Sequence, residues 1–270
     1  MIKIRYLVLS FFVIGIVLYY SGSRCAECNS CGWWCDYIGP ITRLLDDKTE
    51  RLNDYEIEGI DISKYQRAVG WDVVAKQGMD FAFVKASEGA NLTDTHFGQN
   101  WTTIKQVGMK RGAYHFFRPT ISALAQAKNY IDKVPLEPGD LPPVLDAEDD
   151  DGASKELIIS RMQSWLDIVE KRYGVKPIIY TNLKFYYNYI VGNFDDYPLW
   201  IAKYSSVRPQ LVNDKQFKIW QYGQKGKIEG VEGYVDLNVF LGDAAAFEKF
   251  CIQPKVFYSD AFTSKQIENK

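Results

Sequence analysis

Two carboxyl groups at the end of one short apolar stretch are placed to act together on a substrate. The stretch Pro143–Leu145 is followed by Asp146 and, after one alanine, by Glu148. Side chains alternate between the two faces of a β-strand, so Asp146 and Glu148 project from the same face, roughly 6–7 Å apart at the backbone. Two carboxyl groups in one partly buried pocket resist double ionisation, and one keeps its proton near neutral pH. The pair therefore offers an acid and an anion, as glycosidic cleavage requires.

Other acidic residues end or begin apolar runs elsewhere in the chain. Asp61 ends the run that starts at Gly59, and Asp236 follows Val235. Parallel β/α barrels carry their chemistry at the carboxyl ends of the strands, so we expect Asp61 and Asp236 to join the pair there. The three acids directly after Glu148, residues 149–151, are interpreted instead as an acidic loop that caps the following helix.

The elements that must position these acids are short apolar runs, rich in β-branched or aromatic residues, that alternate with stretches of helical spacing. The expected strands are Gly59–Ile62, Phe81–Lys85, Gly112–Phe116, Pro143–Leu145, Pro177–Tyr180, Leu199–Lys203, Lys218–Gln221 and Val235–Phe240. The expected helices are Trp71–Gln77, Phe97–Val107, Ser122–Lys133 and Lys155–Arg172. Such alternation predicts an irregular (β/α) barrel of about eight mainly parallel strands, with fewer helices than a regular TIM barrel because the later connections are short. The alternative is an open doubly wound sheet, although no glycine-rich phosphate loop follows the first strand.

Composition and charge limit the class of protein. The 270 residues are 47% hydrophobic and 24% charged, which is typical of a folded globular protein. The formal net charge is −2 and the isoelectric point about 5.8, so no positive field favours nucleic acid as a partner. No internal repeat of solenoid length is present. One principal domain, acting as a monomer, is the expectation.

The N-terminus has the pattern of an export signal. Lys3 and Arg5 precede the apolar run Tyr6–Tyr20, which ends at Ser21 and Ser23. The run is shorter than the roughly twenty residues that a membrane-spanning helix prefers. We therefore interpret residues 1–23 as a signal peptide; the bulky end of the run leaves an uncleaved membrane anchor as the alternative. Either predicts an exported protein of the cell envelope or the extracellular space.

Four of the five cysteines follow this segment closely. They are Cys25, Cys28, Cys31 and Cys35. Their spacing matches one used for iron–sulfur clusters, but Asp36 replaces the usual proline and an exported segment meets an oxidising compartment. Two local disulfides or an envelope-facing knot are therefore favoured, which leaves Cys251 unpaired. The expected organisation is a Cys-rich segment and linker over 24–56, a catalytic barrel over 57–251 and a tail over 252–270.

Several separated blocks, in order, resemble glycoside hydrolase family 25, the muramidases that cut peptidoglycan between N-acetylmuramic acid and N-acetylglucosamine. The resemblance runs from about Glu58 to Phe250. Its blocks are Gly59–Ser63 with Gln66, Phe81–Gly89, Gly112–Phe117, Leu145–Glu148, Tyr180 with Thr181, Trp200–Ala202 with Tyr204, Trp220–Tyr222 and Val235–Asn238. The resemblance implies a β/α barrel with few helices, peptidoglycan glycan strands as substrate and no cofactor.

The resemblance also implies roles for the acids. Glu148 matches the proton donor of the family. Asp146 matches its partner carboxylate, which either orients the 2-acetamido group of the substrate as nucleophile or stabilises the positive transition state. Asp61 and Asp236 match two further acids at the groove floor, where they hold the pair and tune its protonation.

Aromatic residues at matching positions are expected to line the sugar groove. They are Tyr114, Tyr180, Trp200, Tyr204 and Tyr65. A place among core aromatics is the alternative for each of the first four, and many relatives carry tryptophan near the position of Tyr65. Lys85 and Glu88 either pair with each other, which is favoured, or face the groove. We expect His115 in the core or groove wall and no metal site, because no second nitrogen donor is suitably spaced.

Two other functions compete with the muramidase hypothesis. A chitinase-like hydrolase also carries an Asp-x-Glu strand end, but its two usual upstream acids are replaced here by Leu141 and Val144. A non-catalytic wall-binding barrel is the second, and the presence of all four acids argues against it.

Overall fold

The computed structural model describes residues 52, 54–212 and 215–254, all within one compact unit that spans Thr49–Lys270. Its strands form a single sheet in the order β1-β9-β8-β7-β6-β5-β4-β2-β3. The strands are β1 (Ile57–Ile62), β2 (Phe81–Glu88), β3 (Leu92–Thr93), β4 (Lys110–Phe116), β5 (Val144–Asp146), β6 (Ile178–Asn182), β7 (Leu199–Ala202), β8 (Ile219–Gly226) and β9 (Val235–Phe240). Each of the expected strands lies within or overlaps one of these.

The sheet closes into a barrel because β1 pairs with β2 on one side and with β9 on the other. The strands from β1 round to β8 run parallel, whereas β9 is antiparallel to both of its neighbours. The short β3 adds a hairpin to the end of β2. The predicted irregular barrel is confirmed. The alternative, an open doubly wound sheet, is wrong, because β1 would then lack one of its two neighbours, β2 or β9.

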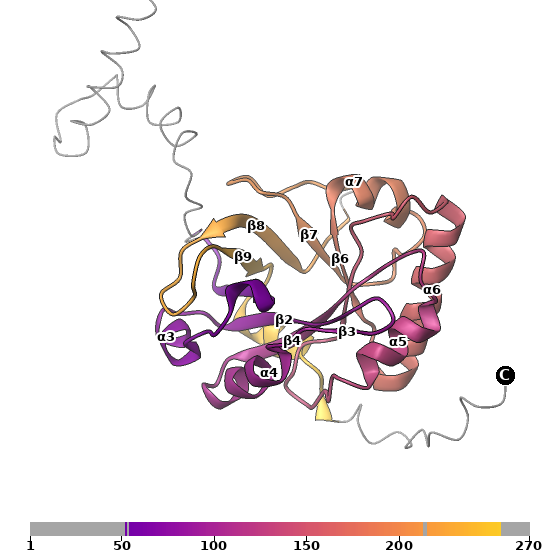
Figure 1. Cartoon of the computed structure of the whole chain (residues 1–270). Helices are drawn as coiled ribbons and strands as arrows, with labels where there is room; N and C mark the ends of the chain where they lie inside the picture. The colour runs from indigo at the N-terminus through magenta and orange to yellow at the C-terminus, as the bar shows by residue number, and fades with distance from the viewer. Residues whose placement is uncertain (1–51, 53, 213–214, 255–270) are drawn as a thin grey trace, which may run out of the picture. The chain divides into compact units, whose positions relative to one another are not determined.

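Helices cover the first part of the barrel and are scarce in the second (Figure 1). They are α3 (Trp71–Lys76), α4 (Phe97–Gln106), α5 (Ala123–Ile131), α6 (Lys155–Tyr173), α7 (Leu183–Phe185) and α8 (Ala244–Phe250), with a 3-10 turn at Lys64–Gln66 and a π-helical turn at Tyr186–Ile190. The longest, α6, begins after the N-cap Ser154, whose side chain accepts from the Leu157 amide, and ends at Gly174, which has a left-handed φ of 71°.

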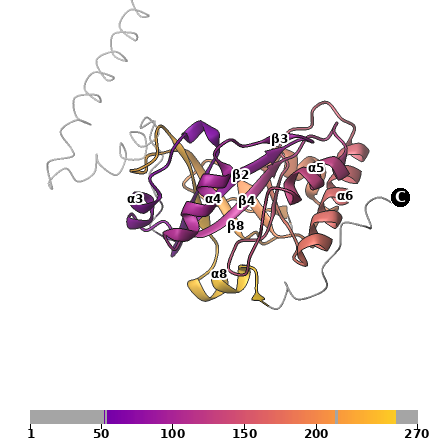
Figure 2. The ribbon, with the colours of Figure 1, turned by 60° about the horizontal axis from the view of Figure 1, so that its bottom comes forward.

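The barrel has two hydrophobic layers, because successive residues of each strand face opposite sides. Along β2, Phe81 and Phe83 point inward, whereas Ala82 and Val84 join the outer layer beneath the helices. Phe83 stacks on Trp200 from β7, with ring centroids 4.5 Å apart. At the lower end of the barrel, α8 places Phe247 against Phe81 and Phe240 (Figure 2). Aromatic side chains therefore fill the barrel interior below the carboxyl ends of the strands.

Two glycines make room for the inner phenylalanines. A Cβ atom at Gly59 would lie 2.5 Å from the ring of Phe81, and one at Gly112 would lie 2.2 Å from the ring of Phe83. The absent side chains thus let large rings fill a narrow barrel.

Gly112→Ala is expected to lower the free energy of unfolding by about 1–3 kcal/mol, because the new methyl group overpacks the barrel beneath the catalytic pocket. Gly98→Ala is the matched control. Gly98 lies in α4, and nothing lies within 4 Å of the position that a methyl group would take there, so alanine should stabilise the helix by up to about 1 kcal/mol. Urea denaturation measures both changes, and an unchanged midpoint for Gly112→Ala would contradict the packing described here.

The expectations for the signal segment and for the cluster of four cysteines concern residues outside the described ones. Within the described residues, Cys251 is a free, buried thiol, and burial raises its pKa to about 11. No helix in that part of the chain is both long and apolar enough to span a membrane.

Candidate active site

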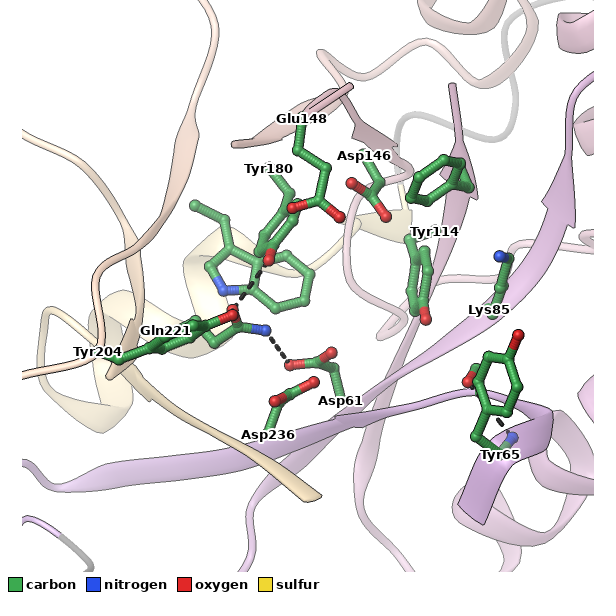
Figure 3. A pocket seen from close by; sticks show the side chains of 13 residues that line it. Asp61, Tyr65, Lys85, Tyr114, Asp146, Glu148, Tyr180, Tyr204, Gln221 and Asp236 are labelled. Atoms are coloured by element: carbon green, nitrogen blue, oxygen red, sulfur yellow. Dashed lines mark hydrogen bonds between the residues drawn. The ribbon is translucent and has the colours of Figure 1, made fainter. Parts of the chain in front are cut away.

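A pocket opens at the carboxyl ends of the parallel strands and brings the predicted site residues together (Figure 3). Its walls are formed by Asp61, Ser63, Tyr65, Lys85, Tyr114, Phe116, Asp146, Glu148, Tyr180, Trp200, Tyr204, Gln221 and Asp236. All four candidate acids and all five candidate aromatic residues are among them. Each strand other than β3 directs a side chain into this space or supports one that does, which explains why the site residues are so widely spaced in the sequence.

The carboxylate pair projects from the end of β5. Asp146 is the last residue of the strand and is 6% exposed, Glu148 is half-buried, and Ala147 between them packs into the outer hydrophobic layer. Both carboxyl groups point into the pocket in Figure 3. The backbone carbonyl of Glu148 accepts a 3.4 Å hydrogen bond from the side chain of Asn182, at the end of β6. Asp146 and Glu148 thus face the same pocket, as a spacing of two predicts, although the strand itself ends at Asp146.

Burial makes the ionised pair costly. Burial raises the pKa of Asp146 well above its ordinary range, and the neighbouring Glu148 raises it further. The pKa of Glu148 is also raised, first by burial and then by the charges of Asp61 and Asp149, while Lys85 lowers it. One oxygen of Asp146, Oδ1, is buried without a hydrogen-bond partner. Burial and mutual repulsion therefore favour protonation of the pair, and Oδ1 of Asp146 is a buried acceptor without a partner.

Asp61 and Asp236 form a second acidic pair on the floor of the pocket. They lie opposite each other in the register of β1 and β9. Because β9 is antiparallel, its first residues lie at the end of the barrel where the other strands finish. Burial raises the pKa of Asp61 to about 6, and burial together with the charge of Asp61 raises that of Asp236 to about 8. The two side chains are hydrogen-bonded, so Asp236 retains a proton that it shares with Asp61.

Asp236→Asn is expected to flatten the dependence of stability on pH. The folded pKa of Asp236 is raised from 3.8 to about 8, so its contribution to stability is complete below the unfolded pKa and is lost as pH rises through the folded one. Asparagine resembles the protonated form at every pH. Melting temperatures measured between pH about 4 and about 8 should fall less in the variant than in the wild type. Parallel curves for the two proteins would contradict the buried, proton-sharing pair.

A hydrogen-bond network holds Asp61 in place. Its Oδ2 accepts from the side-chain amides of Gln221 and Asn238, each at 2.8 Å. Asn238 in turn accepts from the indole of Trp200 at 2.8 Å. The carbonyl oxygen of Gln221 accepts from the hydroxyl of Tyr180 at 2.9 Å. The floor of the pocket is therefore a connected polar layer above the aromatic core.

Gln221 and Asn238 were not singled out from the sequence, although both follow the alternation of their strands. Gln221 lies two residues after the inward-facing Ile219, and Asn238 lies two after Asp236. Ser63 and Phe116 also line the pocket unpredicted. The period-two signal could have found Gln221, Asn238 and Phe116; Ser63 lies beyond the end of β1.

The aromatic residues divide between floor and rim. Trp200 and Tyr180 are 2% and 7% exposed and contact each other edge to face at 4.6 Å. Tyr65 and Tyr204 are 77% and 50% exposed; Tyr65 lies in the 3-10 turn after β1 and Tyr204 in the loop after β7. Tyr114 is half-buried beside the acids, whose charges add to burial in raising its pKa. Trp200 is thus a core residue that also forms part of the pocket lining.

The predicted ion pair between Lys85 and Glu88 is confirmed, with Nζ 2.7 Å from Oε2. Lys85 also lines the pocket, so the two interpretations are not exclusive. It extends the inward series of Phe81 and Phe83 along β2.

His115 is a core residue. It is fully buried, stacks on Trp165 and has a ring nitrogen 2.8 Å from the hydroxyl of Ser87 and the other 3.1 Å from Gln126. Burial lowers its pKa to about 4, so the ring is neutral. His115 follows the inward Tyr114 and therefore faces away from the groove. Across the described ranges there is no cluster of three or more side chains that could hold a metal ion.

The expectation that the acids after Glu148 cap the following helix is wrong. Ser154 caps α6. Asp149 and Asp151 instead contact Arg118, at 3.3 and 3.0 Å. Arg118, from the loop after β4, thus offsets part of the charge of these two acids. The sequence around Glu148 does not predict this contact.

Comparisons with known proteins agree with this geometry. Residues 60–231 match the model of the family described as glycosyl hydrolases family 25. The protein YegX of Escherichia coli K12, described as uncharacterized, is 40% identical over 202 residues, which cover 73% of this chain and 74% of that protein. Lysozyme M1 of Streptomyces globisporus is 33% identical over 232 residues, covering 77% of this chain and 79% of the other.

Solved structures show the same likeness. A family 25 glycosyl hydrolase from Bacillus anthracis has a TM-score of 0.71 and 34% identity, covering 76% of this chain and 98% of that one. The bacterial lysozyme of Streptomyces coelicolor has a TM-score of 0.68 and 30% identity, covering 73% and 98%.

Proposed function

The chain belongs to glycosyl hydrolase family 25, and from this premise we propose that it is a muramidase that hydrolyses the β-1,4 bond between N-acetylmuramic acid and N-acetylglucosamine in peptidoglycan. One observation carries the proposal. Asp146 and Glu148 face the same pocket, and burial together with nearby acidic charges raises the pKa of both. A pocket with one proton on two carboxyl groups supplies both the acid and the anion of glycosidic hydrolysis.

Glu148 is the proposed proton donor to the bridging oxygen. Its partner, Asp146, has the unpaired buried oxygen Oδ1. An N–H donor that binds the Asp146 carboxylate, such as that of a 2-acetamido group on the sugar, would favour the ionised form of Asp146. The shared proton then remains on Glu148. In this way the bound substrate itself would set the protonation that cleavage needs, and water would complete the reaction at the sugar carbon.

Asp61 and Asp236 support the pair from below. Their shared proton limits the negative charge of the pocket, and Gln221 and Asn238 fix the orientation of Asp61. The exposed rings of Tyr65 and Tyr204 lie at the rim, where sugar rings can pack against their faces. We assign these two residues to substrate binding, with Tyr114, Tyr180 and Trp200 forming the wall and floor.

The proposal also covers where the protein acts and its oligomeric state. The apolar run Tyr6–Tyr20 after Lys3 and Arg5 supports export, by a cleaved signal or a membrane anchor, to the envelope or beyond, where peptidoglycan lies. A monomer is the proposed active form.

A comparison of substrates tests the proposal. The purified chain should release new reducing ends from peptidoglycan sacculi and should act more slowly on purified chitin. Faster cleavage of chitin would favour the chitinase-like alternative. Tight binding to sacculi without any new reducing ends would favour a non-catalytic wall-binding barrel.

A further inference from the structure

A series of ion pairs links Lys85, which lines the pocket, through Glu88 at the end of β2 to Arg118. Glu88 contacts two cations, with Oε2 2.7 Å from the Lys85 ammonium and Oε1 2.8 Å from the Arg118 guanidinium. The Arg118 Nε also donates to Oε1 at 3.1 Å. Lys85 lines the pocket, so one end of this series of ion pairs reaches the catalytic space.

At the other end of this series, Arg118 contacts the loop that follows Glu148. Nη1 of Arg118 lies 3.0 Å from Asp151 and 3.3 Å from Asp149. Asp151 has a φ of 47°, in the left-handed region that residues other than glycine seldom adopt, and its amide donates to Asp149 at 3.0 Å. Arg118 therefore secures a strained turn only a few residues from the proposed proton donor.

The contacts of Glu88 are better shielded than ordinary surface ion pairs, whereas the Asp149 side chain is 50% exposed. The exposed fractions of the side chains are 18% for Lys85, 20% for Glu88 and 32% for Arg118. The exposed pair Arg67–Glu232 has values of 72% and 64%. Lys85 and Arg118 also lie 4.7 and 4.6 Å from the ring centroid of Phe116, which lines the pocket. Partial burial and the contact with an aromatic ring both strengthen the interactions of these cations.

We propose that Arg118 is a positioning residue for the acid–base pair, because it fixes the loop behind Glu148 and, through Glu88, directs Lys85 into the pocket. The inference rests on the proposed function. Arg118 need not touch the substrate, since it acts through the two elements that it joins, the end of β2 and the loop after β5.

The charges around Asp146 and Glu148 predict how the loss of Arg118 changes the pH dependence of catalysis. The charged and titratable groups that surround the pair are Asp61, Lys85, Glu88, Tyr114, Asp149, Tyr180, Tyr204 and Asp236. Glu88 raises the pKa of Asp146, Asp149 raises that of Glu148, and Lys85 lowers both. Arg118 neutralises Glu88 and Asp149. Its removal leaves Asp149 without this cation and Glu88 paired with Lys85 alone, so protonated forms of the catalytic pair should persist to higher pH.

The test compares Arg118→Met with the wild type on peptidoglycan. We expect kcat to fall about tenfold to a hundredfold, with little change in KM, because misplacement of a catalytic group affects the chemical step. Both limbs of the profile of kcat/KM against pH should move to higher pH. Adding Asp149→Asn to Arg118→Met should move the basic limb back. Arg172→Met, which removes an exposed cation near the ring of Tyr173, is the control that should leave the profile unchanged.

The outcomes separate this inference from the proposed function. A wild-type chain that releases no reducing ends from the wall overturns the proposed function. An active wild type whose Arg118→Met variant keeps its pH limbs, with or without a loss of kcat, overturns the positioning role. If Arg118→Met does not fold, Asp149→Asn alone should move the basic limb to lower pH, and an unmoved limb counts equally against the inference.

Discussion

Glu148→Gln is expected to reduce the rate of wall hydrolysis by about 10³-fold, within the range attributed to a positioned general acid. Glutamine has the shape of glutamic acid but cannot give up a proton to the bridging oxygen. Burial raises the pKa of Glu148, so its ionised form is costly in the fold. An uncharged residue of the same size should therefore leave stability unchanged or slightly higher. The release of reducing ends from sacculi measures the first effect, and thermal unfolding the second.

Glu156→Gln is the matched control for this variant. Glu156 lies exposed in the first turn of α6 and does not line the pocket, and its replacement by glutamine removes the same charge. The control should hydrolyse the wall at the wild-type rate. Near-normal hydrolysis by Glu148→Gln would instead show that another group supplies the proton.

Asp146→Asn is expected to have the second largest effect, a loss of about 10²-fold in kcat, in the range typical for removing one electrostatic stabiliser of a transition state. Asparagine is uncharged and cannot balance positive charge at the sugar ring. Its other consequence is a change in the pH profile. The acidic limb of kcat/KM reports the ionisation of the anionic partner and should disappear, whereas the basic limb, which reports loss of the proton from Glu148, should remain.

Asp72→Asn provides the control for the loss of a carboxylate, because Asp72 is exposed in α3 and pairs only loosely with Lys76, at 3.8 Å. A profile of Asp146→Asn that keeps both limbs would contradict the assignment of Asp146 as the anion. Wall glycan whose acetamido groups have been converted to amines separates the two roles considered for Asp146. If the acetamido oxygen is the nucleophile, the wild type should lose most of its activity on that glycan.

The repeating period of the strands made much of this site predictable from sequence. Asp146 and Glu148 follow an apolar run with a spacing of two, so a common face could be inferred before the fold was seen. The inward positions of β2 likewise continue from Phe83 to Lys85. Acids at strand ends and the alternation of strands and helices were enough to predict the barrel.

Features that depend on contacts between segments distant in the sequence were harder to predict from the sequence. The antiparallel direction of β9, which brings Asp236 beside Asp61, follows from its pairing with β1 and β8. The role of the acids after Glu148 was misjudged because their partner, Arg118, lies more than thirty residues earlier in the chain. Asn238 was overlooked as a support for Asp61, because its hydrogen bond to Asp61 spans 177 positions.

Mass spectrometry of the fragments released from digested peptidoglycan tests the central claim most directly, because the sugar at the new reducing end identifies the bond that was cut. The pair formed by Asp146 and Glu148 is proposed to cleave on the reducing side of N-acetylmuramic acid. We therefore expect every new fragment to end in N-acetylmuramic acid, and we expect no such fragments from Glu148→Gln. Fragments that end in N-acetylglucosamine, or an intact glycan after exposure to the folded wild-type chain, would contradict the account.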